Sequence, residues 1–421
     1  MQWLVFEDKR SEDLAPLTLL RPAFELICGR EGLRRRLQRW FPTARWGAVV
    51  RDYLKDVYTE EHPDAVVNDI AFAADQPTLV VNGRWLPESR VTEEDLQFDR
   101  AGFVGEEVAW MLLHPDEIRM LSSLDLPSVL NALAQQRRRL EATGTLMQRP
   151  WDLIRLNGTQ LERDFADEGV SQTIMSPHVQ ILGDAADVYL SPQAEIDPYV
   201  VIDARSGPVS VDRDVKVQSF TRIEGPCHIS RGCSIFRAHL RSGTTIGEHC
   251  KVGGEVEESI LHACVNKYHE GFLGHSYICP WVNLGAISTT SDLKSDYSTV
   301  RVPVSGELVD SGLCKVGSFI ADHTKTAIDS MFNTGSSVGV MAMVLPGGRL
   351  LPRHIPSFCN IHFGELAEDW PLEQSLQTAR IAMSRRGCEL TATMEQLIRT
   401  LHRRTQPERD AAIRRAVARR V

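Results

Sequence analysis

The chain has 421 residues and a formal net charge of −9 at pH 7, with 43% hydrophobic and 24% charged residues. This length predicts two or three domains, the composition is typical of a globular protein, and the negative charge argues against nucleic-acid binding. The sequence shows no signal-peptide pattern, no apolar stretch long enough to span a membrane and no C-x-x-C pair among its nine cysteines. We therefore expect a cytoplasmic protein with reduced thiols and no membrane partner.

The first part of the chain, residues 1–165, alternates strand-like and helix-like stretches, which indicates a small α/β domain. Strands are predicted at Trp3–Phe6, Trp46–Val50 and Thr78–Val81, and helices at Pro22–Leu37 and Pro127–Glu141.

A period of six residues begins near Pro177 and continues to about Pro356, so we assign residues 177–356 to a second domain. Aliphatic residues recur six apart, and a glycine follows several of them, at Ile223, Ile229 and Ile235, at Ile246 and Val252, and from Val316 through Ile328 to Val340. This period fits neither a helix nor a single alternating strand. It predicts a left-handed parallel β-helix, in which each hexapeptide is one short strand and stacked coils share a core.

Two segments depart from this period. Residues 287–312 interrupt it with a polar stretch and a short strand around Val302, and long insertions in rigid scaffolds are commonly functional. Residues 365–421 show a helical pattern and form a C-terminal helical tail rich in arginine. Two interpretations of those arginines stay open: a solvated face over a packed helix, or a lid or phosphate contact for a neighbouring subunit.

Several motifs resemble one family. KYHEGFLGHS (267–276), WVNLGA (281–286), SDLKSDYSTV (291–300) and MFNTG (331–335) resemble the acetyltransferase half of bifunctional N-acetylglucosamine-1-phosphate uridyltransferases. PLTLLRP (16–22) and WDLIRLN (151–157) are similar to the N-terminal domain of an alternative bacterial branch of sugar nucleotidyltransferases. The resemblance covers most of the chain. It implies a transferase of UDP-N-acetylglucosamine biosynthesis that uses acetyl-coenzyme A to acylate the amine of glucosamine 1-phosphate.

The resemblance also implies site residues. The family's catalytic histidine lies fourteen residues before the asparagine of its V-N-[IL]-G-A motif, which selects His269 from Asn283. A glutamate fourteen residues earlier, Glu255, would orient that histidine, with Glu257 as the alternative. A neutral imidazole can accept the proton of an attacking amine, and a carboxylate can hold its tautomer.

Further matches concern the ligands. Asn283 and Arg241 match residues that bind substrate, and Ser318 and Asp292 match positions near the coenzyme. The sequence departs from the family where its phosphate-binding lysine would fall, near Glu257 or Ser259. It also has Phe272 for a tyrosine, and Asp292-Leu293 for an Asn-Tyr pair. Two acceptors of the acyl group therefore stay open: an amino-sugar phosphate or a sugar nucleotide.

In the N-terminal domain the resemblance implies nucleotidyl transfer, with Arg21 and Arg30 as phosphate-binding residues and Asn157 in a Mg²⁺ site. The glycine-rich phosphate loop is missing, and the segment Leu79–Trp85 has no carboxylate. Two interpretations remain: a nucleotidyltransferase that needs Mg²⁺, or a degenerate domain that binds a sugar nucleotide or only supports the trimer.

Two other functions stay open. His262, His269 and His275 are spaced seven and six apart, which suggests a zinc enzyme of the carbonic-anhydrase type. Alternatively, the β-helix is a non-catalytic trimeric scaffold that binds a sugar nucleotide. In the acyltransferase interpretation we expect a homotrimer, because residues 287–312 of an adjacent subunit would close over His269.

Overall fold

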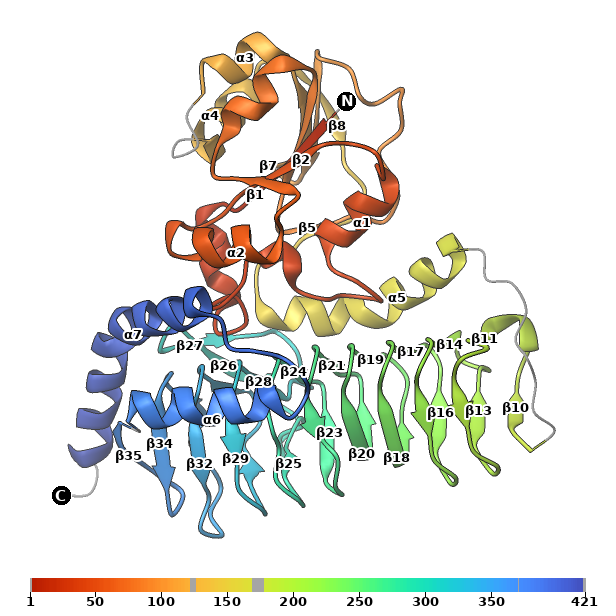
Figure 1. Cartoon of the computed structure of the whole chain (residues 1–421), viewed down its shortest axis with the longest axis vertical. Helices are drawn as coiled ribbons and strands as arrows, with labels where there is room; N and C mark the ends of the chain where they lie inside the picture. The colour runs from red at the N-terminus through yellow and green to blue at the C-terminus, as the bar shows by residue number, and fades with distance from the viewer. Residues whose placement is uncertain (1, 122–125, 169–177, 370, 419–421) are drawn as a thin grey trace.

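The structure is a computed structural model that describes residues 2–121, 126–168, 178–369 and 371–418. An N-terminal α/β domain sits on a long parallel β-helix, whose C-terminal end is covered by two helices (Figure 1). The predicted fold class is therefore confirmed. The expected start of the β-helix at Pro177 lies outside the described residues. Within those residues, none of the helices combines the length and apolar character needed to span a membrane.

A seven-stranded sheet forms the N-terminal domain, in the order β3-β2-β1-β4-β7-β6-β8. The first four of these strands run parallel, and β7 is antiparallel to both of its neighbours. The strands are β1 (Gln2–Phe6), β2 (Trp46–Val49), β3 (Ala65–Val67), β4 (Thr78–Asn82), β6 (Arg100–Val104), β7 (Glu107–Leu113) and β8 (Arg138–Glu141). The helices are α1 (Leu33–Trp40), α2 (Lys55–Glu61), α3 (Pro115–Arg119), α4 (Leu126–Ala134) and α5 (Pro150–Glu168). Two further short strands, β5 (Trp85–Leu86) and β9 (Thr145–Leu146), pair antiparallel.

The two helices predicted in this domain are shorter than expected. The segment Pro22–Leu37 forms a short 3-10 turn and then a loop before α1. In that loop Gly29 has φ +76° and packs so tightly against α5 that an added Cβ would lie 2.3 Å from a carboxylate oxygen of Asp164. The segment Pro127–Glu141 divides into α4 and β8, because its last residues pair with β6.

The β-helix confirms the six-residue period. Aliphatic and cysteine side chains from successive coils stack in one continuous interior core. One wall consists of β11 (Val188–Leu190), β14 (Val209–Val211), β17 (Cys227–Ile229), β19 (Thr244–Ile246), β21 (Ile260–Leu261), β24 (Tyr277–Ile278), β28 (Ser318–Ile320), β31 (Ser336–Val338) and β33 (His354–Ile355). A second nine-stranded sheet contains β10 (Gln180–Leu182), β12 (Glu195–Ile196), β13 (Val201–Asp203), β15 (Lys216–Val217), β16 (Arg222–Glu224), β18 (Ser234–Leu240), β20 (Lys251–Glu257), β22 (Asn266–Lys267) and β23 (Phe272–Gly274).

The C-terminal coils continue this pattern around an insertion. Their strands are β25 (Thr289–Thr290), β29 (Lys325–Thr326), β30 (Met331–Phe332), β32 (Met343–Leu345) and β34 (Cys359–His362). Within the insertion, β26 (Arg301–Val304) and β27 (Glu307–Asp310) form an antiparallel hairpin, which contains the predicted short strand.

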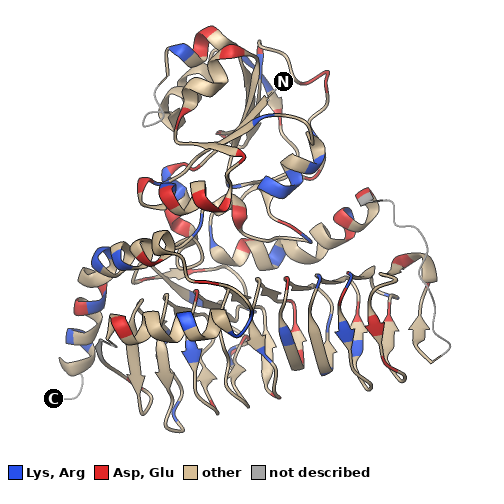
Figure 2. Cartoon of the chain, viewed as in Figure 1, with Lys and Arg blue, Asp and Glu red and all other residues tan. Residues whose placement is uncertain are grey.

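The helical tail begins later than residue 365, because β35 (Glu365–Asp369) pairs antiparallel with β34. Helix α6 (Leu372–Ser384) then runs along the outside of the β-helix, and α7 (Ala392–Ala418) contacts both β35 and α2 (Figure 1). Figure 2 shows basic residues along α7. Several of these arginines are engaged within the chain: Arg399 pairs with Glu373 and Glu395, and Arg409 is fully buried.

The N-terminal domain and the β-helix share a hydrophobic core. Leu17 and Trp151 of the N-terminal domain pack in one cluster with Tyr277 and Phe319 of the β-helix. Helix α5 lies along the wall that contains β17 and β19 (Figure 1). This arrangement decides which polar residues remain accessible to ligands.

Candidate active site

A pocket of about 500 Å³ lies on the β-helix near the C-terminal end of α6. Its walls carry five basic side chains and no aspartate or glutamate: Lys216, Lys251, Lys325, Arg385 and Arg386. Aromatic rings also line it, including Tyr268, which stacks on Phe236 with ring centroids 4.7 Å apart. A cavity with this lining suits a ligand that carries both phosphate groups and flat or apolar parts.

His269 and Asn283, selected from the sequence, both line this pocket. His269 lies in the exposed turn between β22 and β23, with its ring edge-on to Tyr268 at 5.5 Å. The side-chain carbonyl of Asn283 accepts a hydrogen bond of 2.6 Å from the Asn266 amide. This bond leaves the N–H₂ group of Asn283 available to donate to a ligand.

A buried lysine holds the turn that carries His269. Lys267 Nζ donates to the backbone carbonyls of Gly253 at 2.6 Å, His269 at 3.0 Å and Gly271 at 2.5 Å. Burial lowers the pKa of Lys267 to about 8. This lysine was not among the expected site residues, because a Lys in a hexapeptide gives no sign of whether its side chain points inward.

Two expected site residues take other partners. Glu255 was expected to orient His269, but in the described part of the chain its carboxylate pairs with Arg241 (3.3 Å) and not with the histidine. Arg241 also pairs with the alternative candidate Glu257, at 2.8 Å. Arg241 is therefore occupied by two carboxylates, and neither it nor Glu255 lines the pocket.

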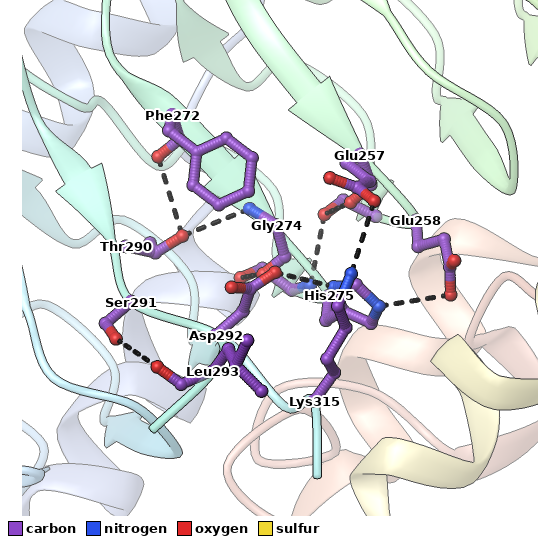
Figure 3. A network of polar contacts seen from close by, with 12 residues as sticks. Glu257, Glu258, Phe272, Gly274, His275, Thr290, Ser291, Asp292, Leu293 and Lys315 are labelled. Atoms are coloured by element: carbon purple, nitrogen blue, oxygen red, sulfur yellow. Dashed lines mark hydrogen bonds and ion pairs between the residues drawn. The ribbon is translucent and has the colours of Figure 1, made fainter. Parts of the chain in front are cut away.

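His275, itself buried, is the centre of a charge network at the base of the insertion (Figure 3). Its Nδ1 lies 2.8 Å from Asp292 and its Nε2 lies 3.2 Å from Glu258. Burial acts to lower the pKa of His275, but the hydrogen bonds and charges of the two carboxylates outweigh it and raise that pKa to about 9. Lys315 adds a contact to Glu257 at 3.5 Å.

The two residues expected near the coenzyme, Asp292 and Ser318, do not line the pocket. The Asp292 carboxylate lies 2.8 Å from His275. Ser318 is fully buried, and its backbone N–H donates to the Ser276 hydroxyl at 2.8 Å. Spacing alone could not distinguish a residue in the wall of the β-helix from one in the pocket.

Within one chain, the described structure does not bring together the three histidines of the zinc interpretation. His262 lies 3.3 Å from the backbone carbonyl of Glu25 in the domain junction, and burial lowers its pKa to about 3. His275 is held by two carboxylates, and His269 lies in the separate pocket. No group of three or more His, Cys, Asp or Glu side chains in the described ranges is arranged to hold a metal ion.

The phosphate and metal residues expected in the N-terminal domain lie in its junction with the β-helix. Arg21 forms a two-pronged ion pair with Asp322 of the β-helix, and both side chains are largely buried. The Asn157 amide, fully buried, accepts from the Gly29 N–H (2.7 Å) and donates to the Gly243 carbonyl (2.8 Å).

Arg30 belongs to the same junction. Its side chain, only 10% exposed, contacts Asp212 of the β-helix at 3.4 Å. Arg21, Arg30 and Asn157 therefore join the two domains, and the prediction that they bind a nucleotide is corrected.

A second cavity, of about 650 Å³, lies at the carboxyl ends of β1, β2 and β3. Ligands commonly bind at this edge of open parallel sheets. Three of its five carboxylates are paired internally: Glu7 with Arg51 at 3.1 Å, Asp8 with Arg84 at 2.6 Å, and Glu107 with Arg10 at 2.6 Å. Burial acts to raise the pKa of Asp8, but the bonds from Arg84 outweigh it and lower that pKa. This cavity was not predicted, although Glu7 and Asp8 directly follow the first predicted strand.

Comparisons with known proteins agree with this two-part architecture. Residues 3–168 match the family model described as sugar nucleotidyl transferase. The chain is 31% identical over 144 residues to the bifunctional sugar-1-phosphate nucleotidylyltransferase/acetyltransferase of Sulfurisphaera tokodaii, covering 34% of this chain and 36% of that protein. It is 33% identical over 109 residues to the bifunctional protein GlmU of a Jannaschia species, covering 25% of this chain and 23% of that protein.

Among solved structures, the UDP-N-acetylglucosamine acyltransferase of Campylobacter jejuni aligns with a TM-score of 0.21 and 10% identity, covering 50% of this chain and 94% of that one. The chain spans about a quarter to a third of the length of the first curated relatives that it matches. The chain thus joins a domain that matches the sugar nucleotidyl transferase model to a parallel β-helix, and it is similar over part of its length to bifunctional GlmU and to a bifunctional sugar-1-phosphate nucleotidylyltransferase/acetyltransferase.

Proposed function

We propose that the pocket on the β-helix transfers an acetyl group from acetyl-coenzyme A to the amine of an amino-sugar phosphate or sugar nucleotide. One observation carries this proposal: His269 and Asn283 line the same pocket as five basic side chains, with no carboxylate among the lining residues. Both ligands of the proposed reaction carry phosphate groups, and this lining suits them.

Each part of the pocket has a role in this reaction. The imidazole of His269 accepts the proton of the amine as its nitrogen attacks the thioester carbonyl. The free N–H₂ group of Asn283 donates to the oxygen on which negative charge develops. The sulfur of coenzyme A then leaves with a proton, and the products are the amide and the free thiol.

The site is completed in a homotrimer. His269 lies at a corner of the β-helix, where the N–H of Ile287 on the next coil bonds to the carbonyl of the adjacent Glu270 at 2.8 Å. Ile287 is 61% exposed, and Tyr199 and Phe220, stacked on earlier coils, are 69% and 72% exposed. Large apolar side chains in such positions are typical of a surface that another subunit covers.

We infer that the N-terminal cavity does not transfer a nucleotide through a metal held by Glu7 and Asp8. The carboxylates that would hold Mg²⁺, Glu7 and Asp8, are saturated by Arg51, Arg84, Asn82 and backbone N–H groups. A magnesium site needs carboxylate oxygens that are free to bind the ion. Glu7 and Asp8 therefore do not fit the metal.

The experiment is an assay of free-thiol release from acetyl-coenzyme A with a panel of amino-sugar phosphates and nucleotide-linked amino sugars. We expect release that requires the amino sugar and is lost in His269→Gln. Saturable coenzyme binding without release from any acceptor would favour the scaffold function instead.

A further inference from the structure

Two cysteines from distant parts of the chain lie on neighbouring segments near the edge of the pocket. Cys264 lies in the turn between β21 and β22 and lines the pocket, and Cys388 lies in the loop after α6. Both are free thiols; Cys388 is exposed and Cys264 is half-buried. Burial is the main cause that raises the pKa of Cys264 to about 11, and the Cys388 thiol acts in the same direction.

Backbone contacts place the two residues together independently of their titration. Cys264 and His249 occupy equivalent corners of adjacent coils, because β20 and β22 pair in register and the Cys264 N–H donates to the carbonyl of Glu248 at 2.8 Å. The guanidinium of Arg386 donates to the carbonyl of His249 at 2.7 Å. Cys388 is two residues further along, and its N–H bonds back to Met383 at 3.0 Å. The loop after α6 is thus held against the coil that neighbours Cys264.

We propose that Cys264 and Cys388 form a reversible disulfide that fastens the end of α6 to the β-helix beside the pocket. The oxidant is a low-molecular-weight disulfide such as oxidised glutathione. The exposed Cys388 thiolate attacks one glutathione sulfur and releases the first glutathione thiolate. The Cys264 thiol then gives its proton to a base in the solvent and attacks the Cys388 sulfur, which forms the protein disulfide and releases the second glutathione thiolate. Two electrons reduce the oxidant, and the protons of both cysteines end on the two released thiols.

The bond would control entry to the pocket. Arg385 and Arg386, which line it, lie directly between α6 and Cys388. The disulfide would hold both arginines against the β-helix. The loop could then no longer move aside to admit a phosphate-bearing ligand. This consequence rests on the proposed function, whereas formation of the disulfide does not.

The chemical test uses the full-length protein treated with oxidised glutathione and digested without reduction. We expect a cross-linked peptide that joins Cys264 to Cys388 and disappears after dithiothreitol. The matched control is Cys314→Ser, which removes the other exposed cysteine and should leave the cross-link intact. Cys388→Ser should abolish it. A product with only glutathionylated Cys388, or a bond between other cysteines, would overturn the proposal.

The functional test measures coenzyme A binding by calorimetry on reduced and oxidised protein. We expect weaker binding after oxidation, restored by dithiothreitol, in the wild type and in Cys314→Ser but not in Cys388→Ser. Equal coenzyme A binding by the cross-linked and reduced forms would show that the disulfide does not control entry to the pocket. Absence of binding in both forms, with the cross-link present, would count against the proposed function alone.

Discussion

The two cavities differ in how their charges are used. In the N-terminal cavity, Glu7, Asp8 and Glu107 are each neutralised by an arginine of the same chain. In the β-helix pocket, Lys251, Lys325 and Arg385 have no acidic partner within 4.0 Å among the described residues, and burial lowers the pKa of Lys325 to about 8. Charges paired internally stabilise a fold, whereas unpaired charges around a cavity are available to a ligand. This difference is why we place catalysis in the β-helix.

The largest effect is expected from His269→Gln. Loss of a general base costs about a hundredfold to ten-thousandfold in rate. We expect this loss in kcat, with little change in KM for acetyl-coenzyme A, because the proton transfer occurs only in the transition state. Steady-state thiol-release kinetics measure both. The control is His239→Gln, which removes a partly exposed β-helix histidine that lies 3.1 Å from Glu224. An unchanged kcat in His269→Gln would show that catalysis does not take place in this pocket.

The next largest effect is expected on the free energy of unfolding, from a substitution in the junction between the domains. Arg21→Ala leaves Asp322 buried without its partner, and breaking a buried pair in this way costs about 3–5 kcal/mol. Urea unfolding should show this loss. Arg45→Ala breaks an exposed pair with Asp75, whose side chains are 56% and 59% exposed, and should cost roughly 0–1 kcal/mol. Equal losses in the two variants would mean that Arg21 does not join the domains as described.

A smaller effect is expected from Lys267→Met. This change removes the three bonds to the turn that carries His269, and misplacement of a catalytic group by about 1 Å can cost about a hundredfold in rate. We expect lower kcat with KM nearly constant. Lys251→Met, at a pocket residue without such bonds, should instead raise KM for the coenzyme. If both variants changed only KM, Lys267 would not position the histidine.

The smallest effect concerns pH and His275. Because Asp292 and Glu258 raise its pKa to about 9 from the ordinary value of about 6.5, its contribution to stability is fully present below pH 6.5. That contribution falls as the pH rises through about 9. Asp292 and Glu258 stay ionised over this range, since His275 lowers the pKa of both. Other charged groups nearby are Lys315, Glu257 and Arg155.

Urea unfolding from pH 6 to 10 measures this contribution as the difference between the wild type and His275→Gln. Lys267 and Lys325 have lowered pKa values, so their effect on stability has the opposite pH trend. Because both proteins contain these lysines, subtracting one stability from the other cancels that trend. A difference that does not vary with pH would show that His275 is not charged between the carboxylates.

Much of the fold could be predicted because the six-residue period reports directly on inward-facing side chains. The pairing of His269 with Asn283 in one pocket could be predicted because both positions lie on neighbouring coils of a regular scaffold. Arg21, Arg30 and Asn157 were misassigned because sequence alone does not show that the N-terminal domain packs on the β-helix. Packing of the two domains turned these polar residues into junction contacts.

The most direct measurement follows both possible products on the same wild-type preparation: free thiol from acetyl-coenzyme A, and pyrophosphate from UTP with magnesium, across a panel of amino-sugar 1-phosphates. The account predicts thiol release with at least one acceptor and little or no pyrophosphate. Robust pyrophosphate release without thiol release would contradict it, because catalysis would then reside in the N-terminal cavity and not beside His269.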